Sequence, residues 1–212
     1  MTSAYIMYQD EAMKKTQSEK ILKLIERKGM LRPRDLNESS IPRAILQRLH
    51  QEGLITRISR GLYTLPRAQV TEHHTFAEAA KRVPNGILCL LSALSFHGLT
   101  SQAPFQIWMA IDRKSRLPKV DYPSIRFVRF SAQALTEGIE EHMIDGVRVK
   151  MYTPAKTVAD CFKYRNKIGL DVALEALRDC WSQRTCTMDE LRKYGRICRV
   201  ENVMKPYIQA LL

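Results

Sequence analysis

A helical pattern followed directly by two short extended segments is the feature that most constrains how this sequence can fold. Residues 41–52 repeat apolar side chains at helical spacing, and Gly53 ends this helix. Residues 54–58 and 62–65 then show two short strand patterns, which the turn at residues 59–61 joins. We therefore predict a helix and an antiparallel hairpin in immediate succession.

Two further elements precede this helix. Residues 16–28 form an amphipathic helical pattern, and residues 32–36 form a short second element. Residues 37–40 supply turn and capping side chains before the next helix. Three helices and a hairpin are the elements of a winged helix-turn-helix, so we predict that fold over residues 16–67. Residues 1–15 are then an N-terminal extension.

The third predicted helix has a polar face suited to DNA. This face holds no carboxylate and consists of Arg43, Gln47, His50 and Gln51. Arginine and glutamine side chains can make bidentate hydrogen bonds to guanine and adenine edges in the major groove. The alternative is an ordinary solvated face, which more often mixes charges of both signs.

The predicted hairpin carries positive charge without compensating acids. Arg57 and Arg60 flank Ser59, and no acid occurs between Gly53 and Pro66. We expect these side chains to lie against phosphates or the minor groove, as the wing of the fold would. Helix-and-hairpin modules of this kind also dock proteins, so the order of elements alone leaves both partners open.

The charge of the whole chain points the same way. Its 212 residues include 34 Lys and Arg against 22 Asp and Glu, a net charge of +12. Residues 32–67 contain seven Lys and Arg against three acids, so the predicted DNA-reading segment shares this excess. Such a balance suggests a polyanionic partner such as nucleic acid, and the alternative is a basic but solvated surface.

A second, larger unit is expected over residues 75–212, after a boundary near residues 67–74. Its pattern is mixed α+β, with strands in the middle and helices at both ends. The predicted helices span residues 75–83, 87–97, 153–162, 170–181, 188–194 and 201–212, and the predicted strands span 105–111, 125–130, 140–144 and 147–152. We expect residues 87–97 to be the buried central helix, and Lys156 and Asp160 to pair on the outer side of a later helix.

Two groups of basic residues in this unit are candidates for a second contact. The first group lies in the loop between two predicted strands and comprises Arg113, Lys114, Arg116 and Lys119. Arg148 and Lys150 form the second group, on one face of a predicted hairpin strand. Such residues suit a phosphate backbone or an acidic protein, and a simply solvated loop is an equal alternative.

Composition argues against several classes of protein. The longest apolar run, residues 87–91, is far shorter than the roughly 20 residues that would cross a bilayer. The first 15 residues show no secretory signal. Five cysteines without a Cys-x-x-Cys pair favour reduced thiols in the cytosol, and the adjacent His73 and His74 have no neighbouring thiol to complete a zinc site. We therefore expect a cytoplasmic protein without metal or cofactor.

Catalytic motifs are missing as well. The glycines form no phosphate-binding loop, and no Asp-x-Asp pair is present to hold two metal ions. Residues 112–114 fit a short nuclease pattern, but the nearest preceding acid is the distant Glu78. Ser92, Ser95 and His97 are residue types that can act in catalysis, but a structural role for His97 at the end of a helix is the favoured interpretation. We expect no enzyme activity and no catalytic residues, with a nuclease-related DNA-binding protein as an alternative.

Four segments of this sequence carry a resemblance to a known family. They are RGLYTLP at residues 60–66, CLLSALSFHGL at 89–99, IWMAI at 107–111 and YTPAKTVADCF at 152–162. In their order and spacing they resemble the AbiEi family of antitoxins and autoregulators from bacterial abortive-infection systems, which are type IV toxin–antitoxin systems. The resemblance runs from about residue 20 to the C-terminus. Asp112 departs from the neutral residue expected there, which changes the charge of the loop that follows.

The resemblance implies a transcriptional repressor that is also an antitoxin. Its winged helix would bind double-stranded DNA at inverted repeats in its own promoter, as a monomer that pairs on DNA or as an oligomer. Its second domain would neutralise a cognate nucleotidyltransferase-like toxin, directly or without a stable complex. By position, Arg43, Gln47 and Gln51 would meet base edges, and Ser39, Ser40, Arg57 and Arg60 would meet the DNA backbone. Rival hypotheses are a plain regulator whose second domain dimerises or senses a signal, and a protein-docking adaptor.

Overall fold

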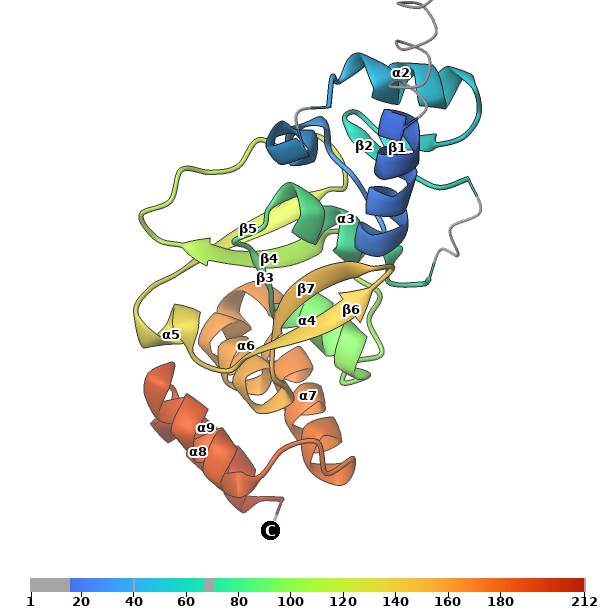
Figure 1. Ribbon diagram of the computed structural model, residues 1–212. Helices are drawn as coiled ribbons and strands as arrows, with labels where there is room; N and C mark the ends of the chain where they lie inside the picture. The colour runs from blue at the N-terminus through green and yellow to red at the C-terminus, as the bar shows by residue number, and fades with distance from the viewer. Residues whose placement is uncertain (1–15, 40, 67–70, 212) are drawn as a thin grey trace, which may run out of the picture. The chain divides into compact units, whose positions relative to one another are not determined.

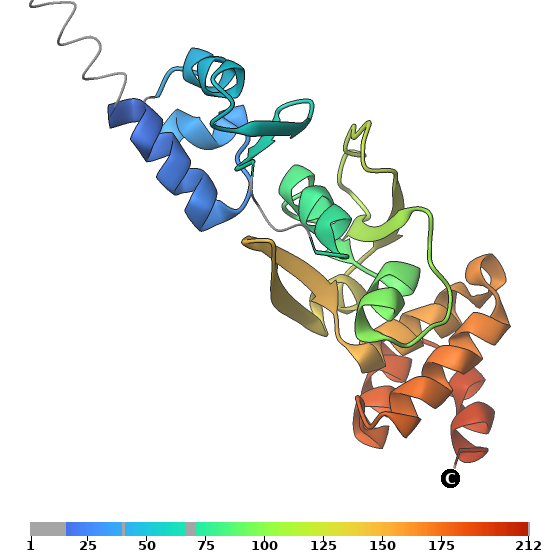
Figure 2. The same ribbon diagram turned by 90° about the vertical axis from the view of Figure 1, so that its right-hand side faces the viewer.

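The computed structural model describes residues 16–39, 41–66 and 71–211, which divide into two compact units (Figures 1 and 2). The first unit contains the described residues up to His74 together with Met143–Val147. The second contains Thr75–His142 and Arg148–Leu212. The predicted N-terminal extension, residues 1–15, lies outside the described residues.

The first unit has the predicted order of three helical elements and a hairpin, which confirms the winged helix-turn-helix arrangement. Its elements are a helix over residues 16–28, the 3-10 helix η1 (Pro33–Ser39), α2 (Ala44–Gln51), and the antiparallel strands β1 (Thr56–Ser59) and β2 (Leu62–Thr64). The core is aliphatic and comprises Ile21, Ile25, Leu31, Leu36, Ile41, Ile45, Leu46, Leu49 and Ile55. Most of these are apolar positions of the helical patterns, so the sequence periodicity reports the buried side of each helix, and Leu31 and Ile55 add to the core from outside the helices.

The third helix begins later than its sequence pattern suggests. The pattern starts at Ile41, whereas α2 starts at Ala44 with Arg43 as its N-cap. Pro42 accounts for the exclusion of Ile41, because its ring disfavours the helical conformation for the residue before it. Ile41 is nevertheless buried, since it packs into the core from the segment that leads into the helix.

The second unit is built on a five-stranded mixed sheet, which confirms the α+β class. The strands are β3 (Ile87–Leu88), β4 (Ile107–Asp112), β5 (Ile125–Phe130), β6 (Ile139–Ile144) and β7 (Val147–Tyr152). Their order in the sheet is β5-β4-β3-β7-β6. β4 runs parallel to β5 and antiparallel to β3, and β3 runs parallel to β7.

Helices cover this sheet and extend beyond it at the C-terminal end (Figure 2). They are α3 (His74–Arg82), α4 (Leu90–His97), α5 (Gln133–Thr136), α6 (Pro154–Ile168), α7 (Leu170–Ser182), α8 (Met188–Ile197) and α9 (Glu201–Gln209). α6 packs against α4, α7, α8 and α9 and is therefore the central helix of the unit. None of the helices in the described ranges is long and apolar enough to span a bilayer.

The expectation of one buried helix over residues 87–97 is partly wrong. Ile87 and Leu88 form strand β3, opposite Ala110 and Met109 of β4, and helix α4 starts only at Leu90. A short apolar run is equally suited to a buried strand and a buried helix, so periodicity alone does not separate them. Pairing with β4 on one side and β7 on the other decides for the strand.

The expectation of an exposed Lys156–Asp160 pair is also wrong. The two side chains are 0% and 2% exposed, on the buried side of α6. An i,i+4 pair of opposite charges usually marks a solvated helix face. Here α6 is covered by several neighbouring elements, and the two charges neutralise each other inside the unit.

The cysteines follow the predicted reduced state only in part. Cys89, Cys161 and Cys198 are free and buried. Cys180 and Cys186 form a disulfide, with their Cα atoms 5.8 Å apart. The turn after α7 brings these two together, and a spacing of six residues gives no sign of this in the sequence.

Candidate nucleic-acid interface

Helix α2 separates an apolar side from a polar one. Ile45, Leu46 and Leu49 are buried in the core of the first unit. The predicted reading residues Arg43, Gln47, His50 and Gln51 are all exposed. The structure thus leaves the predicted polar face of the helix open to a partner.

Arg48 lies on the border between these two sides and anchors the helix. Its guanidinium donates a hydrogen bond of 2.8 Å to Ser18 Oγ in the first helix, and its Nε lies 3.6 Å from Glu52. Glu52 is the sole acid in the sequence between Ile41 and Pro66. The one acid of the segment that forms α2 and the hairpin is therefore engaged by Arg48.

Two of the predicted reading residues also make contacts within the protein. Arg43 donates a hydrogen bond of 3.1 Å to Asn37 Oδ1, at an exposed position. His50 Nδ1 lies 3.2 Å from the carbonyl oxygen of Ile55, and its ring meets the edge of the Tyr63 ring. His50 thus also joins α2 to the hairpin, a role that the sequence pattern did not reveal.

The hairpin presents the predicted wing cations. Arg57 and Arg60 are exposed, Ser59 is half-buried, and Gly61 closes the turn with a φ of +69°. Among the residues that the structure describes, the Arg57 guanidinium donates one long hydrogen bond of 3.4 Å, to the carbonyl oxygen of Ser59. Both arginines are therefore available to an outside anion.

The base of the hairpin is fixed to the rest of the unit. Leu31 and Tyr63 exchange two backbone hydrogen bonds of 2.9 and 3.0 Å. Thr64 Oγ1 donates to the carbonyl oxygen of Gly29 at 3.0 Å. These bonds tie β2 to the segment that follows the first helix, and a rigid DNA-reading surface requires such support.

The two predicted serine contacts are not described at the level of side chains. Ser39 is the last residue of η1, and nothing is described of its side chain. Ser40 lies outside the described residues. Both remain predictions from the sequence.

Residues 19–66 match the family described as transcriptional regulator, AbiEi antitoxin. The match contains α2 and the hairpin and confirms the AbiEi resemblance over this segment. The structure is also similar to the crystal structure of the RV2827C protein from Mycobacterium tuberculosis, with a TM-score of 0.55 and 13% identity over 85% of this chain and 71% of that chain. At this identity the likeness shows a shared fold. No curated protein matches the chain.

The predicted second basic contact is only partly assembled. Arg113, Lys114, Arg116 and Lys119 are exposed on the loop between β4 and β5. Arg148 is exposed but lies 3.4 Å from Glu141 on β6, and Lys150 is half-buried. The loop therefore keeps its positive charge, whereas the charge of Arg148 is partly offset.

Three of the residues considered for catalysis, Ser92, His97 and Asp112, make hydrogen bonds within the protein. The Ser92 hydroxyl is buried and accepts a hydrogen bond of 2.8 Å from the backbone N–H of Trp108. His97 Nε2 lies 2.8 Å from the carbonyl oxygen of Tyr152, and Asp112 Oδ1 accepts from the N–H of Lys114 at 2.6 Å. Within residues 16–39, 41–66 and 71–211, no three His, Cys, Asp or Glu side chains are grouped as metal ligands would be.

Proposed function

We propose that this protein is a sequence-specific DNA-binding repressor of its own operon that also acts, in the cytosol, as the antitoxin of a neighbouring toxin. Its first unit would bind inverted repeats in its promoter, with α2 in the major groove and the hairpin against the adjacent backbone. The second unit would carry the antitoxin activity. Such a division of roles fits a family of antitoxins that are also transcriptional regulators.

The observation that carries the DNA-binding part is the exposed, acid-free face of α2 beside an arginine-bearing wing. Gln47 and Gln51 offer amide groups that suit adenine edges, and Arg43 offers a guanidinium that suits guanine. Arg57 and Arg60 supply the charge that phosphates require. Base-reading and backbone-binding side chains thus lie on one continuous segment, residues 43–60.

The test is a gel-shift titration of the purified protein against its own upstream DNA and a scrambled duplex of equal length. We expect tighter binding to the upstream DNA. The logarithm of the affinity should fall with the logarithm of salt concentration, with a slope of about −0.9 per neutralised phosphate. Equal affinity for both duplexes would contradict sequence-specific repression.

Toxin neutralisation needs a separate test. Cells that express the neighbouring gene are complemented with the full chain or with the full chain carrying Arg57→Ala and Arg60→Ala. Protection by both forms would place antitoxin activity outside the wing. No protection by either form would favour a plain regulator whose second unit dimerises or senses a signal.

A further inference from the structure

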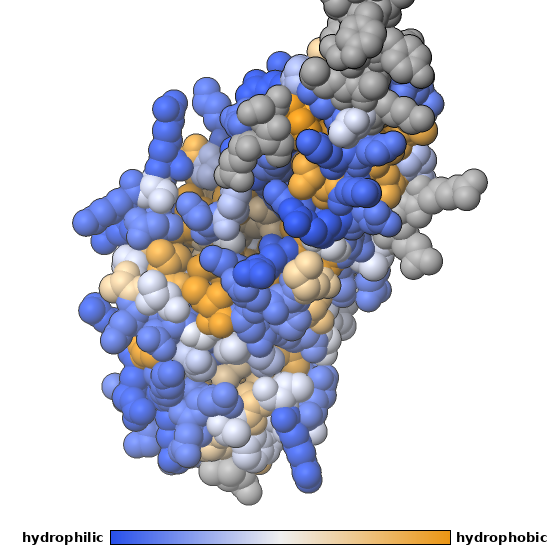
Figure 3. All heavy atoms as spheres, in the orientation of Figure 1, coloured by the Kyte–Doolittle hydropathy of each residue, from blue (hydrophilic) through white to orange (hydrophobic). Residues whose placement is uncertain are grey.

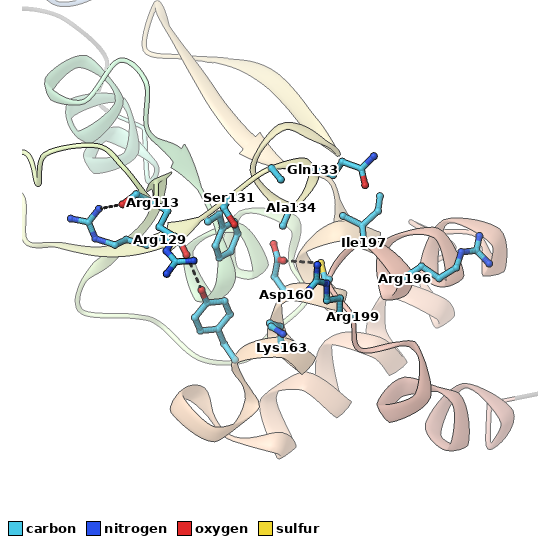
Figure 4. A pocket seen from close by; sticks show the side chains of 14 residues that line it. Arg113, Arg129, Ser131, Gln133, Ala134, Asp160, Lys163, Arg196, Ile197 and Arg199 are labelled. Atoms are coloured by element: carbon cyan, nitrogen blue, oxygen red, sulfur yellow. Dashed lines mark hydrogen bonds between the residues drawn. The ribbon is translucent and has the colours of Figure 1, made fainter.

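A pocket of about 670 Å³ opens in the second unit, away from the predicted DNA-reading residues in sequence. Its wall comes from four segments: the ends of β4 and β5, residues 131–134, the middle of α6, and the end of α8 with the residues after it (Figure 4). A volume of this size is within the range of about 300–1,000 Å³ that is common for small-molecule sites. The face shown in Figure 3 is largely hydrophilic around α8 and α9.

Positive side chains dominate this wall. They are Arg113, Arg129, Lys163, Arg196 and Arg199. Arg196 lies 3.6 Å from Glu201, whereas the other four have no carboxylate within ion-pair distance among the described residues. Like charges gathered in a concave site raise the local potential and attract an anion.

The single carboxylate in the wall does not offset these cations. Asp160 accepts hydrogen bonds of 2.7 and 2.6 Å from the buried ammonium of Lys156. Its Oδ1 also accepts from Cys198 Sγ at 3.2 Å. Burial raises the pKa of the Cys198 thiol, which therefore stays protonated and can donate. The Asp160 charge is thus matched within the protein.

The wall is also held in place before any ligand arrives. The Arg129 guanidinium donates to the carbonyl oxygens of Arg113 and Ser115 at 2.6 and 2.9 Å, which fixes the start of the β4–β5 loop. Ala132 has a φ of +49°, a conformation that L-residues rarely adopt and that is concentrated at ligand-binding segments. The backbone that carries Arg113 is therefore ordered in advance, which lowers the cost of ordering this part of the wall on binding.

We propose that this pocket binds a nucleotide, with its phosphates held by Arg113, Lys163 and Arg199. Guanidinium groups match phosphate oxygens through paired hydrogen bonds, and lysine adds a point charge. The half-buried ring of Tyr164 and the side chain of Ile197 give the wall an apolar part suited to a planar base. The cations surround a pocket instead of following an open stripe, which favours a small ligand over a nucleic-acid strand. This inference does not depend on the proposed DNA binding.

The test is isothermal titration calorimetry of the full chain with ATP, AMP, adenosine, pyrophosphate and a short single-stranded oligonucleotide. We expect affinity to fall from ATP to AMP, and adenosine not to bind. The double variant Arg113→Gln/Lys163→Gln should lose at least tenfold in ATP affinity. Both positions are exposed, so these substitutions should leave the fold intact.

The matched control is Arg178→Gln/Lys205→Gln, which removes the same charge from exposed positions on α7 and α9 that do not line this pocket. Its ATP affinity should stay within twofold of the unmodified protein. Equal losses in both double variants would overturn the proposal, as would the absence of ATP binding. Pyrophosphate that binds as tightly as ATP would reduce the site to a simple anion site. Binding of the oligonucleotide but of no mononucleotide would make the pocket a contact for a nucleic-acid strand. Either of these last two results would overturn the proposal that the pocket binds a nucleotide.

Discussion

The ammonium of Lys156 is enclosed with the carboxylate of Asp160, and its Nζ also lies over the ring faces of Tyr152 and Phe130, at 4.0 and 4.9 Å from their centroids. Both charges lie inside the second unit, where water does not solvate them. A buried ion pair is tolerated because each charge offsets the desolvation of the other. The pair therefore makes the packing of α6 dependent on two residues one helical turn apart.

Breaking this pair should destabilise the protein strongly. Lys156→Met or Asp160→Asn leaves one charge buried without its counter-charge, which costs about 3–5 kcal/mol. The free energy of unfolding can be measured by urea titration with tryptophan fluorescence, because both tryptophans, Trp108 and Trp181, belong to the second unit.

An exposed pair serves as the control. Lys193 lies 3.4 Å from Glu137, and both side chains are about half exposed, so Lys193→Ala should cost less than about 1 kcal/mol. The double variant Lys156→Met/Asp160→Leu should cost less than the sum of its single changes, since it removes both charges. A Lys156→Met variant as stable as Lys193→Ala would show that burial of the pair is not a determinant of stability.

Gly138 is expected to resist substitution more than Gly98, another glycine with positive φ. A Cβ atom at Gly138 would lie 2.8 Å from Lys156 Cβ and 3.0 Å from Tyr194 Cε1, whereas one at Gly98 would meet nothing within 4 Å. The φ values are similar, +72° and +65°. Gly98→Ala should therefore cost about 1–2 kcal/mol, the strain of the left-handed backbone alone. Gly138→Ala should cost a further ~1–3 kcal/mol from crowding, and equal losses of unfolding free energy would contradict this.

Stability should fall as the solution is acidified through the range in which histidine titrates. Burial lowers the pKa of His97, against the opposing effects of its bond to the Tyr152 carbonyl and of the Glu140 carboxylate. The unfolded chain then binds a proton near pH 6.5 that the folded chain takes up only at lower pH, so acidification favours unfolding. His97→Gln should reduce the loss of unfolding free energy between pH 7.5 and 5.5. His50→Gln, at an exposed position in the other unit, should leave that loss unchanged in tryptophan fluorescence.

Substitutions in α2 and in the wing should affect DNA binding in different ways. Gln47→Ala should cost about 1–3 kcal/mol on the operator and relax the preference at one or two base pairs, because a base contact carries sequence information. Arg60→Ala should weaken binding to all DNA sequences similarly and reduce the salt slope by about 1, because a phosphate contact carries no sequence information. Competition gel shifts with operator and random duplexes measure both effects, with Lys205→Ala as a control. The same ratio of losses for the two variants would mean that helix and wing are wrongly assigned.

Local patterns were enough to predict the first unit. The amphipathic repeat of residues 16–28 and 41–52, the glycine that ends α2 and the turn at residues 59–61 depend on neighbours within a few positions. The helices and the hairpin that these patterns form can therefore be predicted from a single sequence. The exclusion of Ile41 from α2 also has a local cause, the proline that follows it.

The pocket was not predictable in this way. Arg113 belongs to a basic loop that the sequence shows directly. Arg129, Lys163, Arg196 and Arg199 are divided among β5, α6 and the end of α8 with the residues after it, and in the sequence they contribute only to the net charge. Their convergence depends on the mixed order of the strands and on the packing of α8 against α6.

By itself, the sequence determined the α+β class, the order of helices and strands, and the exposed polar face of α2, because these depend on periodicity and turn chemistry along a short stretch. The tertiary structure alone decided that Ile87 and Leu88 form a strand, that Lys156 and Asp160 are buried, and that five basic side chains of the second unit surround one pocket. Pairing, burial and charge convergence are sums over contacts between distant residues, and a local pattern does not contain those contacts.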